Sequence, residues 1–105
     1  MQHWTPAELA AHLDQIPDKL CLLDVREPWE YQLVHLNNSQ LIPLGQLMQG
    51  MHQLPTDLPV AVICHHGVRS MHACYLLARA GFAPINVTGG IDRWAREIDH
   101  SMPIY

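Results

Sequence analysis

A cysteine and an arginine separated by four residues are the side chains of this sequence best suited to covalent chemistry on an anion. Cys64 follows the apolar run 60–63, and Arg69 comes after a short loop that contains Gly67. An apolar, β-branched run that leads through such a loop into a helix-forming segment is typical of a strand, a turn and a helix. The Cys64 thiol is therefore expected at the carboxyl end of a buried strand. Backbone N–H groups of residues 65–70 converge there as the helix begins, so the sequence predicts an anion site that contains a thiol.

The other residues of the loop fit the same chemistry. A thiolate at a helix N-terminus is stabilised by unpaired N–H groups and by the helix dipole. Arg69 adds a fixed positive charge, and its planar guanidinium suits two oxygens of a sulfate- or phosphate-like group. Gly67 allows a turn tight enough for several N–H groups to point at one atom. Ser70 is the expected N-cap of the helix, and His65 and His66 are expected to add donors or charge at the mouth.

The alternative is that Cys64 is a core cysteine and the loop an ordinary connection between a strand and a helix. A lone cysteine in a strand would favour that interpretation. Here a glycine follows Cys64 by three residues, an arginine follows by five, and a helix is predicted next. This combination favours a nucleophile.

Composition excludes several classes of partner. The chain has 105 residues, 49% of them hydrophobic, which suffices for one core, so residues 1–105 are predicted to form one domain. A net charge of −4 without a Lys/Arg cluster argues against nucleic acid and against an anionic membrane surface. No apolar run approaches the roughly 20 residues that span a membrane, and residues 1–6 lack the features of a secretory signal. The expected location is the cytoplasm.

Neither the cysteines nor the histidines show metal-binding spacing. The three cysteines are odd in number and form no Cys-x-x-Cys pair, so neither a disulfide framework nor a zinc site is predicted. Cys21 and Cys74 are expected to pack in the core. Of the eight histidines, only His65, His66 and His72 lie close in sequence, and they lack the i, i+4 spacing with acidic support of a helical metal site. The sequence predicts no metal and no cofactor.

Helices and strands alternate along the first half of the chain. Thr5, Pro6 and Glu8 predict a capping box at the start of a helix. Residues 19–25 form a nearly continuous apolar run, which is typical of a strand buried on both faces of a parallel sheet. A second, very short strand is predicted at residues 40–43.

Two further segments in the first half of the chain are predicted to be amphipathic helices. Residues 28–33 are predicted to be a short helix with Trp29 and Leu33 packed inward. Residues 43–54 carry apolar side chains at spacings of three and four and predict a helix weakened by Gly50, with its methionines filling the core.

The second half continues the alternation. A helix is expected from about Ser70 to Ala80 with Gly81 as its C-cap, then a strand at residues 84–87, a turn at 88–90 and a helix at 91–98. Residues 100–105 receive no assignment. Strands and helices alternating at this pitch predict an α/β fold with a mostly parallel sheet and helices on both faces.

Asp24 and Arg26 end the first predicted strand. Because ligands of open α/β sheets collect at the carboxyl ends of strands, these two side chains are candidates to support the same rim as Cys64. The alternative is that Asp24 bonds a neighbouring loop while Arg26 pairs with an acid. Both interpretations stay open at this point.

Several segments together resemble the rhodanese-like sulfurtransferase family. The loop Cys64-His-His-Gly-Val-Arg-Ser70 resembles that family's active-site loop, and residues 22–31, LLDVREPWEY, resemble its strand-end segment. His35-Leu36 with Ile42-Pro43, and Gly81-Phe82 with Gly89-Gly90-Ile91 and Trp94, resemble its later motifs. The resemblance covers nearly the whole chain.

The resemblance implies a fold, a reaction and a set of roles. The fold would be a single rhodanese-like domain of three layers, with about five strands between helices. Cys64 would take a sulfane sulfur from a donor such as thiosulfate or a persulfide, become a persulfide, and pass the sulfur to a small or protein acceptor. Arg69 would bind the donor. The backbone amides that would surround the terminal sulfur belong to His65, His66, Gly67, Val68, Arg69 and Ser70.

Two alternatives remain beside sulfur transfer. Cysteine phosphatases and arsenate reductases resemble this chain in having a thiol and an arginine, but the phosphatase loop has five residues between them. The four residues between Cys64 and Arg69 suit a single sulfur atom better than a tetrahedral phosphate. A non-catalytic rhodanese-like binding or regulatory module is the other alternative, and retention of both Cys64 and Arg69 argues against it. The physiological donor and acceptor stay open.

Overall fold

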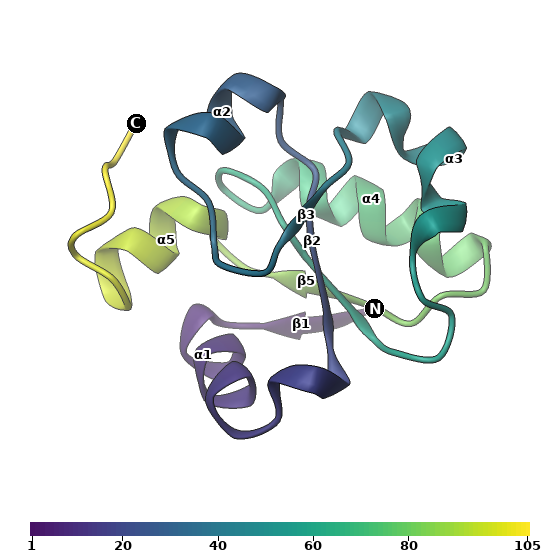
Figure 1. Cartoon of the computed structure of the whole chain (residues 1–105), viewed down its shortest axis with the longest axis horizontal. Coiled ribbons are helices and arrows are strands. Elements are labelled where there is room, and N and C mark those ends of the chain that lie inside the picture. The colour runs from purple at the N-terminus through teal and green to yellow at the C-terminus, as the bar shows by residue number, and fades with distance from the viewer.

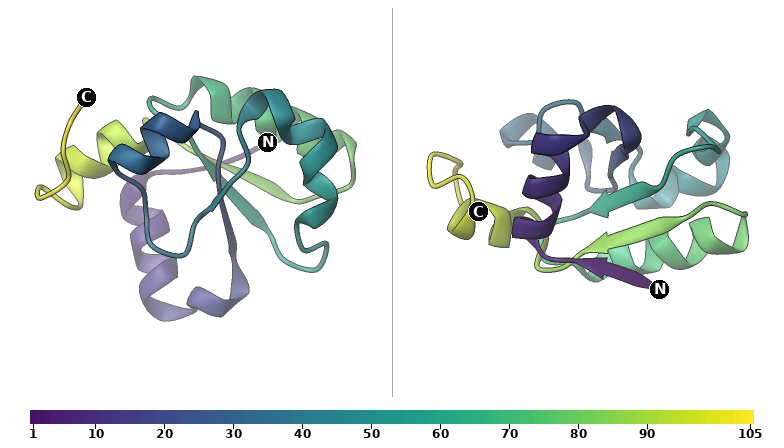
Figure 2. Two further views of the ribbon diagram at one scale, coloured as in Figure 1. Left: turned by 45° about the horizontal axis from the view of Figure 1, so that its top comes forward. Right: turned by 90° about the horizontal axis from the view of Figure 1, so that it is seen from below.

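Five parallel strands form a central sheet with helices packed on both faces (Figures 1 and 2). The computed structural model describes residues 1–105. The strands are β1 (Gln2–Trp4), β2 (Cys21–Asp24), β3 (Gln40–Leu41), β4 (Val60–Ile63) and β5 (Pro84–Val87). The helices are α1 (Pro6–Gln15), α2 (Pro28–Leu33), α3 (Leu47–Gly50), α4 (Val68–Arg79) and α5 (Gly90–Glu97). The predicted parallel α/β fold is therefore confirmed.

The sheet has the strand order β1-β5-β4-β2-β3, and all its pairings are parallel. The central strand β4 is entirely buried and pairs with β2 on one side and β5 on the other. Because all strands run the same way, their carboxyl ends meet at one edge of the sheet. Cys64 directly follows β4 at this edge, as the apolar run 60–63 predicted.

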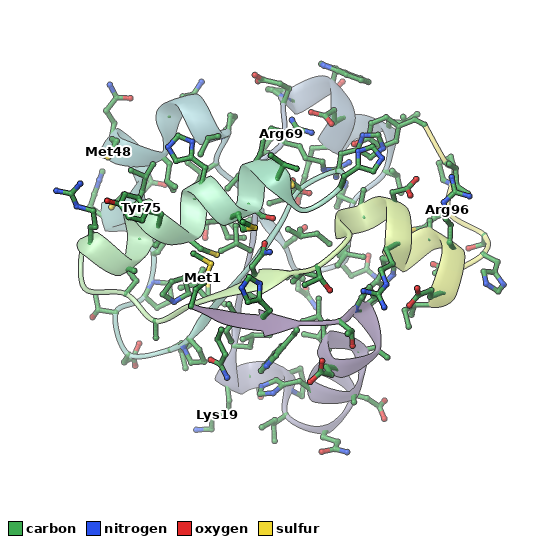
Figure 3. The ribbon with its side chains drawn as sticks, turned by 180° about the vertical axis from the view of Figure 1, so that it is seen from behind. Met1, Lys19, Met48, Arg69, Tyr75 and Arg96 are labelled. Carbon is green, nitrogen blue, oxygen red and sulfur yellow. The ribbon has the colours of Figure 1, made fainter.

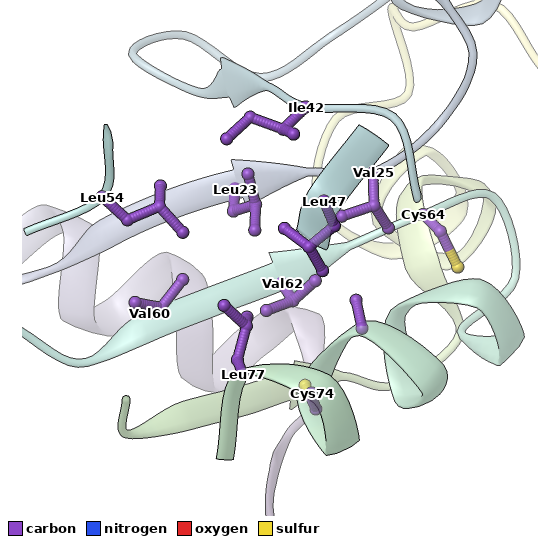
Figure 4. Packing of buried hydrophobic residues seen from close by; sticks show 11 residues of the cluster. Leu23, Val25, Ile42, Leu47, Leu54, Val60, Val62, Cys64, Cys74 and Leu77 are labelled. Atoms are coloured by element: carbon purple, nitrogen blue, oxygen red, sulfur yellow. The ribbon is translucent and has the colours of Figure 1, made fainter. Parts of the chain in front are cut away.

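Alternation along the strands divides the core into two clusters. On one face, Val60 and Val62 pack with Leu77 of α4 and Leu47 of α3 (Figure 4). On the other face, Ala61 and Ile63 pack in a cluster that contains Leu9 of α1 and Trp94 of α5. A strand buried on both faces needs apolar side chains at every position, which explains the uninterrupted run. Cys64 lies at one end of the first cluster, and Cys74 of α4 is fully buried in it, as predicted.

The local signals for helix ends were partly correct. The Thr5 side chain accepts from the backbone N–H of Glu8 while the Glu8 carboxylate accepts from the backbone N–H of Thr5, which confirms the capping box. Gly81 was predicted as the C-cap of α4, but the helix ends at Arg79 and its C-cap is Ala80, so Gly81, with a φ of 96°, is the residue after the cap. Ser70 as N-cap was wrong. The N-cap is Gly67, and α4 begins at Val68, so Ser70 lies within its first turn.

Two other local predictions were wrong, and one strand was not predicted at all. The edge strand β1 was not predicted, because it pairs through its backbone with β5 and its own side chains are largely exposed. Residues 43–54 form short 3₁₀ turns around α3 instead of one helix, and Met48 is 70% exposed. Trp29 and Leu33 of α2 are also exposed, while the buried residue of that helix is Glu30.

Candidate active site

The Cys64 sulfur is surrounded by donors from the start of α4. Backbone N–H groups of Gly67 and Ser70 donate to Sγ at 3.1 and 3.3 Å, and the thiol donates to Ser70 Oγ at 3.4 Å. Cys64 is only 1% exposed. These contacts place the sulfur at the point where the turn and the helix N-terminus meet, a position that stabilises negative charge on sulfur.

The conformation of Gly67 makes this turn. Its φ is 100°, in the left-handed region that disfavours side chains, and an added Cβ would lie 3.1 Å from the backbone nitrogen of Gly89. Gly67 is buried, so it brings its N–H group onto the Cys64 sulfur without occupying the space beside it.

Ser70 is held by a residue that the sequence did not single out. Its hydroxyl donates to Oδ1 of Asn86 on β5, and both residues are almost fully buried. With its own proton engaged there, the Ser70 oxygen presents its lone pairs to the Cys64 thiol. Asn86 is a buried position of the strand predicted at residues 84–87, and no sequence pattern marked it as part of the site.

Arg69 forms a two-point ion pair with Glu30 of α2. Its Nη1 and Nη2 donate to the Glu30 carboxylate at 2.6 and 2.9 Å, and Figure 3 shows Arg69 at the end of α4 that faces α2. The Arg69 side chain is 35% exposed, while that of Glu30 is 4% exposed. The hydrogen bonds from Arg69 lower the pKa of Glu30 to about 2 despite its burial, and Glu30 in turn raises the pKa of Arg69.

The pairing leaves one side of the guanidinium available. Glu30 binds the Nη1 and Nη2 end of Arg69, whereas Nε makes no hydrogen bond within the chain. A guanidinium carries five N–H donors, so the edge between Nε and Nη2 can still bind an anion. Glu30 thereby orients Arg69 without using up its donors. Glu30 was not predicted from the sequence, although its carboxylate also accepts from the backbone N–H of Glu27 at the start of α2, a spacing that is a recognisable capping signal.

Asp24 and Arg26 pair with each other under the site. Arg26 Nη2 lies 2.7 Å from Asp24 Oδ2, and both side chains have no exposed surface. Arg26 also donates to the backbone oxygen of Val34 at 2.6 Å and to the hydroxyl of Tyr105 at 2.9 Å. The structure therefore places the two residues as a buried support behind Glu30 and Tyr105, with no surface of their own at the rim.

Tyr105 is the last residue to reach the site, from the segment after α5. Its hydroxyl donates to Glu30 Oε2 at 2.7 Å, and its ring stacks on His65 with centroids 3.9 Å apart and planes 4° from parallel. Burial raises the pKa of Tyr105 to about 12, so the phenol stays protonated. Residues 100–105 had no predicted structure. A single tyrosine with no periodic neighbours gives no signal of such a role.

The N-terminus of α5 packs on the loop and brings Asp92 beside the histidines. Ile91 N–H donates to Cys64 O at 2.8 Å, and Asp92 N–H donates to His65 O at 3.0 Å. Ligand atoms of His65, His66 and Asp92 lie within 4.8 Å of one another, which is the one grouping in the chain with the donor types of a metal site. Asp92 is already paired with Arg96, and burial and the neighbouring His66 lower the pKa of His65. His72 does not join this group.

Three hollows on the surface lie away from the Cys64 loop. None of the three is lined by Cys64 or by residues 65–70. The Cys64 sulfur therefore lies outside these hollows, and the side chain is only 1% exposed. No helix of the chain has the length and apolar character needed to cross a bilayer.

Comparisons with known proteins identify the family of this chain. The family model described as Rhodanese-like domain matches residues 5–97. The chain is 38% identical over 104 residues to the probable adenylyltransferase/sulfurtransferase MoeZ of Mycobacterium tuberculosis, an alignment that covers 96% of this chain but only 26% of MoeZ. It is 37% identical over 76 residues to the thiosulfate sulfurtransferase GlpE of Vibrio cholerae, covering 71% of this chain and 72% of GlpE.

A solved structure matches over the full length. The crystal structure of a rhodanese-related protein from Thermoplasma volcanium superposes with a TM-score of 0.84 at 32% identity, covering 100% of this chain and 98% of that one. By sequence and by fold, the chain therefore belongs to the rhodanese-like domain family.

Proposed function

We propose that this chain, acting as a single domain, is a sulfurtransferase that carries a sulfane sulfur on Cys64. The observation that carries the proposal is the set of donors around the Cys64 sulfur, from Gly67, Ser70 and the start of α4. The sulfurtransferase names of MoeZ and GlpE support the reaction class. The cytoplasmic location and the absence of a cofactor stay predictions.

The reaction has two half-steps. The Cys64 thiolate attacks the outer sulfur of a donor such as thiosulfate, so a new S–S bond forms at Cys64 while the donor's S–S bond breaks. Sulfite leaves with the electron pair. A thiophilic acceptor such as cyanide or a protein thiol then attacks the outer sulfur of the persulfide, and the Cys64 thiolate leaves and is regenerated. No external oxidant or reductant is needed.

The residues of the loop have distinct proposed roles. Backbone N–H groups between His65 and Ser70 stabilise the charged sulfur, and two of them already point at Sγ. The free edge of Arg69 binds the oxygens of an anionic donor. Asp24 and Arg26 act only as support, because they are buried and paired.

The test is intact-mass measurement after exposure to thiosulfate. We expect a gain of one sulfur atom that is lost when cyanide is added, with thiocyanate as the product. Cys64→Ser should abolish both the gain and the turnover. Cys21→Ser and Cys74→Ser serve as matched controls, because the loop N–H groups donate to Cys64 and to neither of these two thiols, and both variants should retain the sulfur gain.

Three outcomes would contradict the proposal. A sulfur gain that persists in Cys64→Ser would assign the carrier to another cysteine. Absence of any gain, with every donor of the thiosulfate, persulfide and glutathione persulfide classes, would favour the non-catalytic binding module. Hydrolysis of an aryl phosphate faster than thiosulfate turnover would favour a phosphatase.

A further inference from the structure

The segment after α5 folds back and ends against the site. In Figure 1 the yellow end of the ribbon leaves α5 and reaches the neighbourhood of α2. Backbone N–H groups of Asp99 and Met102 are bonded to Trp94 O and Asp99 O, and Met102 packs against the α1 and α5 cluster. This segment is therefore held in place, and it delivers Tyr105 to a defined position.

Tyr105 contacts both Glu30 and His65. Its hydroxyl donates to the Glu30 carboxylate, which holds the Nη1 and Nη2 end of Arg69. Its ring covers one face of His65, the residue next to Cys64. The edge of Trp29 meets the same ring at a centroid distance of 5.8 Å.

The hydrogen bonds form a continuous chain from the core to the exposed guanidinium. Asp24 pairs with Arg26, Arg26 donates to the Tyr105 hydroxyl at 2.9 Å, and that hydroxyl donates to Glu30 at 2.7 Å. Glu30 then binds Arg69 at 2.6 Å. The Tyr105 hydroxyl accepts from Arg26 and donates to Glu30, so it joins the two halves of this chain of hydrogen bonds.

Arg69 on its own would not stay in one orientation. Its side chain is long, 35% exposed and attached to the first turn of α4. An arginine that must meet a small anion loses less conformational freedom on binding if a carboxylate already fixes its plane. The Glu30 carboxylate can fix that plane only if its own rotation is restrained, and Tyr105 is bonded to the oxygen that faces Arg69 Nη2.

We propose that Tyr105 is a positioning residue for donor binding, acting through Glu30 to orient the free edge of Arg69 for an anionic sulfur donor. The proposal rests on the proposed sulfurtransferase function and adds a residue 41 positions away from Cys64 in the sequence. By this proposal, residues 98–105 are a structural part of the site.

The decisive variant is Tyr105→Phe, which removes the hydroxyl and keeps the ring stacked on His65. In two-substrate kinetics with thiosulfate and cyanide, kcat/KM for thiosulfate should fall by about three- to tenfold, the scale of one lost hydrogen bond. The value of kcat/KM for cyanide should not change, because the second half-step no longer involves the anionic donor.

Tyr31→Phe is the matched control. It also removes a tyrosine hydroxyl that makes a 2.7 Å hydrogen bond, to Ser39 O, and it lies beside Glu30 in the same helix. Its hydroxyl is not connected to Arg69. Thermal unfolding of both variants gives the loss of stability, and only Tyr105→Phe should change kcat/KM for thiosulfate.

A double-mutant cycle tests the route through Glu30. Adding Tyr105→Phe to Glu30→Gln should have little further effect on kcat/KM for thiosulfate, because the carboxylate that the hydroxyl orients is already gone. Nitrogen-15 NMR of the arginine side chains gives a readout without catalysis. The Arg69 N–H signals should be protected from exchange in the wild type and in Tyr31→Phe, and lose that protection in Tyr105→Phe.

Each contrary result is distinguishable from a failure of the proposed function. Unchanged kcat/KM for thiosulfate and unchanged Arg69 signals in Tyr105→Phe would overturn the inference while Cys64 still gains sulfur. An equal loss in Tyr31→Phe, or a full further loss in the Glu30→Gln background, would also overturn it. If the wild type carries no sulfur on Cys64, the proposed function fails, and the Arg69 signals alone then decide whether Tyr105 positions the arginine.

Discussion

At the scale of single residues, the site depends on side chains that hold other side chains. Cys64 is stabilised by backbone donors, but Ser70 next to it is held by Asn86 and Arg69 is held by Glu30. Asn86 and Glu30 are both buried polar groups with satisfied hydrogen bonds. Such groups are costly to bury unless they are paired, so each one restricts its partner to a single arrangement.

Replacing Asn86 tests this dependence. Asn86→Val leaves the buried Ser70 hydroxyl without its acceptor, which should lower the free energy of unfolding by about 1–3 kcal/mol. The freed hydroxyl can then turn its proton toward Cys64, so the rate of sulfur uptake should also change. Chemical unfolding and the rate of mass gain with thiosulfate measure the two effects.

The control for that variant is Asn37→Ala, which changes an exposed asparagine in the loop after α2. It should alter neither stability nor sulfur uptake. If Asn86→Val behaves like Asn37→Ala, the hydrogen bond to Ser70 has no role in the site.

At the scale of elements, α5 forms the second wall of the loop. Gly90 begins this helix with a φ of 62°, and a Cβ there would collide with the backbone oxygens of Cys64 and His65. The helix N-terminus can therefore approach closely enough for Ile91 and Asp92 to bond those two oxygens. The two consecutive glycines predicted a turn, whereas their contact with the loop requires the tertiary structure.

Gly90→Ala tests this close contact. The added methyl group forces α5 away from the loop and places a side chain in a left-handed conformation, so we expect a loss of roughly 2 kcal/mol or more in stability. Sulfur uptake at Cys64 should fall with it, because the loop loses two of its backbone bonds.

Gly45→Ala is the matched substitution outside the site. A Cβ at Gly45 meets nothing within 4 Å, and its φ lies outside the left-handed region. It should leave the melting temperature and sulfur uptake unchanged. Equal effects of the two substitutions would refute a specific role for the contact between α5 and the loop.

At the scale of the whole molecule, ion pairs and hydrogen bonds among Asp24, Arg26, Tyr105, Glu30 and Arg69 connect distant parts of the chain. Arg69 lowers the pKa of Glu30 from 4.5 to about 2. A carboxyl group with a lower pKa in the folded state contributes stability above its unfolded pKa and loses it as the pH falls. The contribution of Glu30 is therefore complete above about pH 4.5 and disappears as the pH approaches about 2.

The lowered pKa of Glu30 gives a prediction for unfolding at acid pH. Between pH 7 and pH 3 the wild type should lose more stability than Glu30→Gln, by on the order of 1 kcal/mol after allowance for solvent around Arg69. Denaturant unfolding at several pH values measures it. Parallel pH profiles for the two proteins would show that the ion pair contributes nothing.

Much of this organisation was predictable from the sequence, for physical reasons that are local. The continuous apolar run 60–63 can be buried only in the middle of a sheet, and the Thr5 capping box acts over three residues. The order Cys64, Gly67, Arg69 places a thiol, a tight turn and a charge within one turn of a helix. Local signals of this kind located the strands β2 to β5, most of the helices and the candidate nucleophile.

What the sequence did not determine are the partners that arrive from elsewhere in the chain. Glu30, Asn86 and Tyr105 reach the loop from α2, β5 and the last segment, and the helix period alone assigned Trp29 and Leu33 inward in place of Glu30. Cys64 and its loop donors were thus determined by short-range sequence. The orientation of Arg69 and Ser70 was decided only by the tertiary structure, because a buried polar side chain is specified by its distant partner and leaves no periodic pattern.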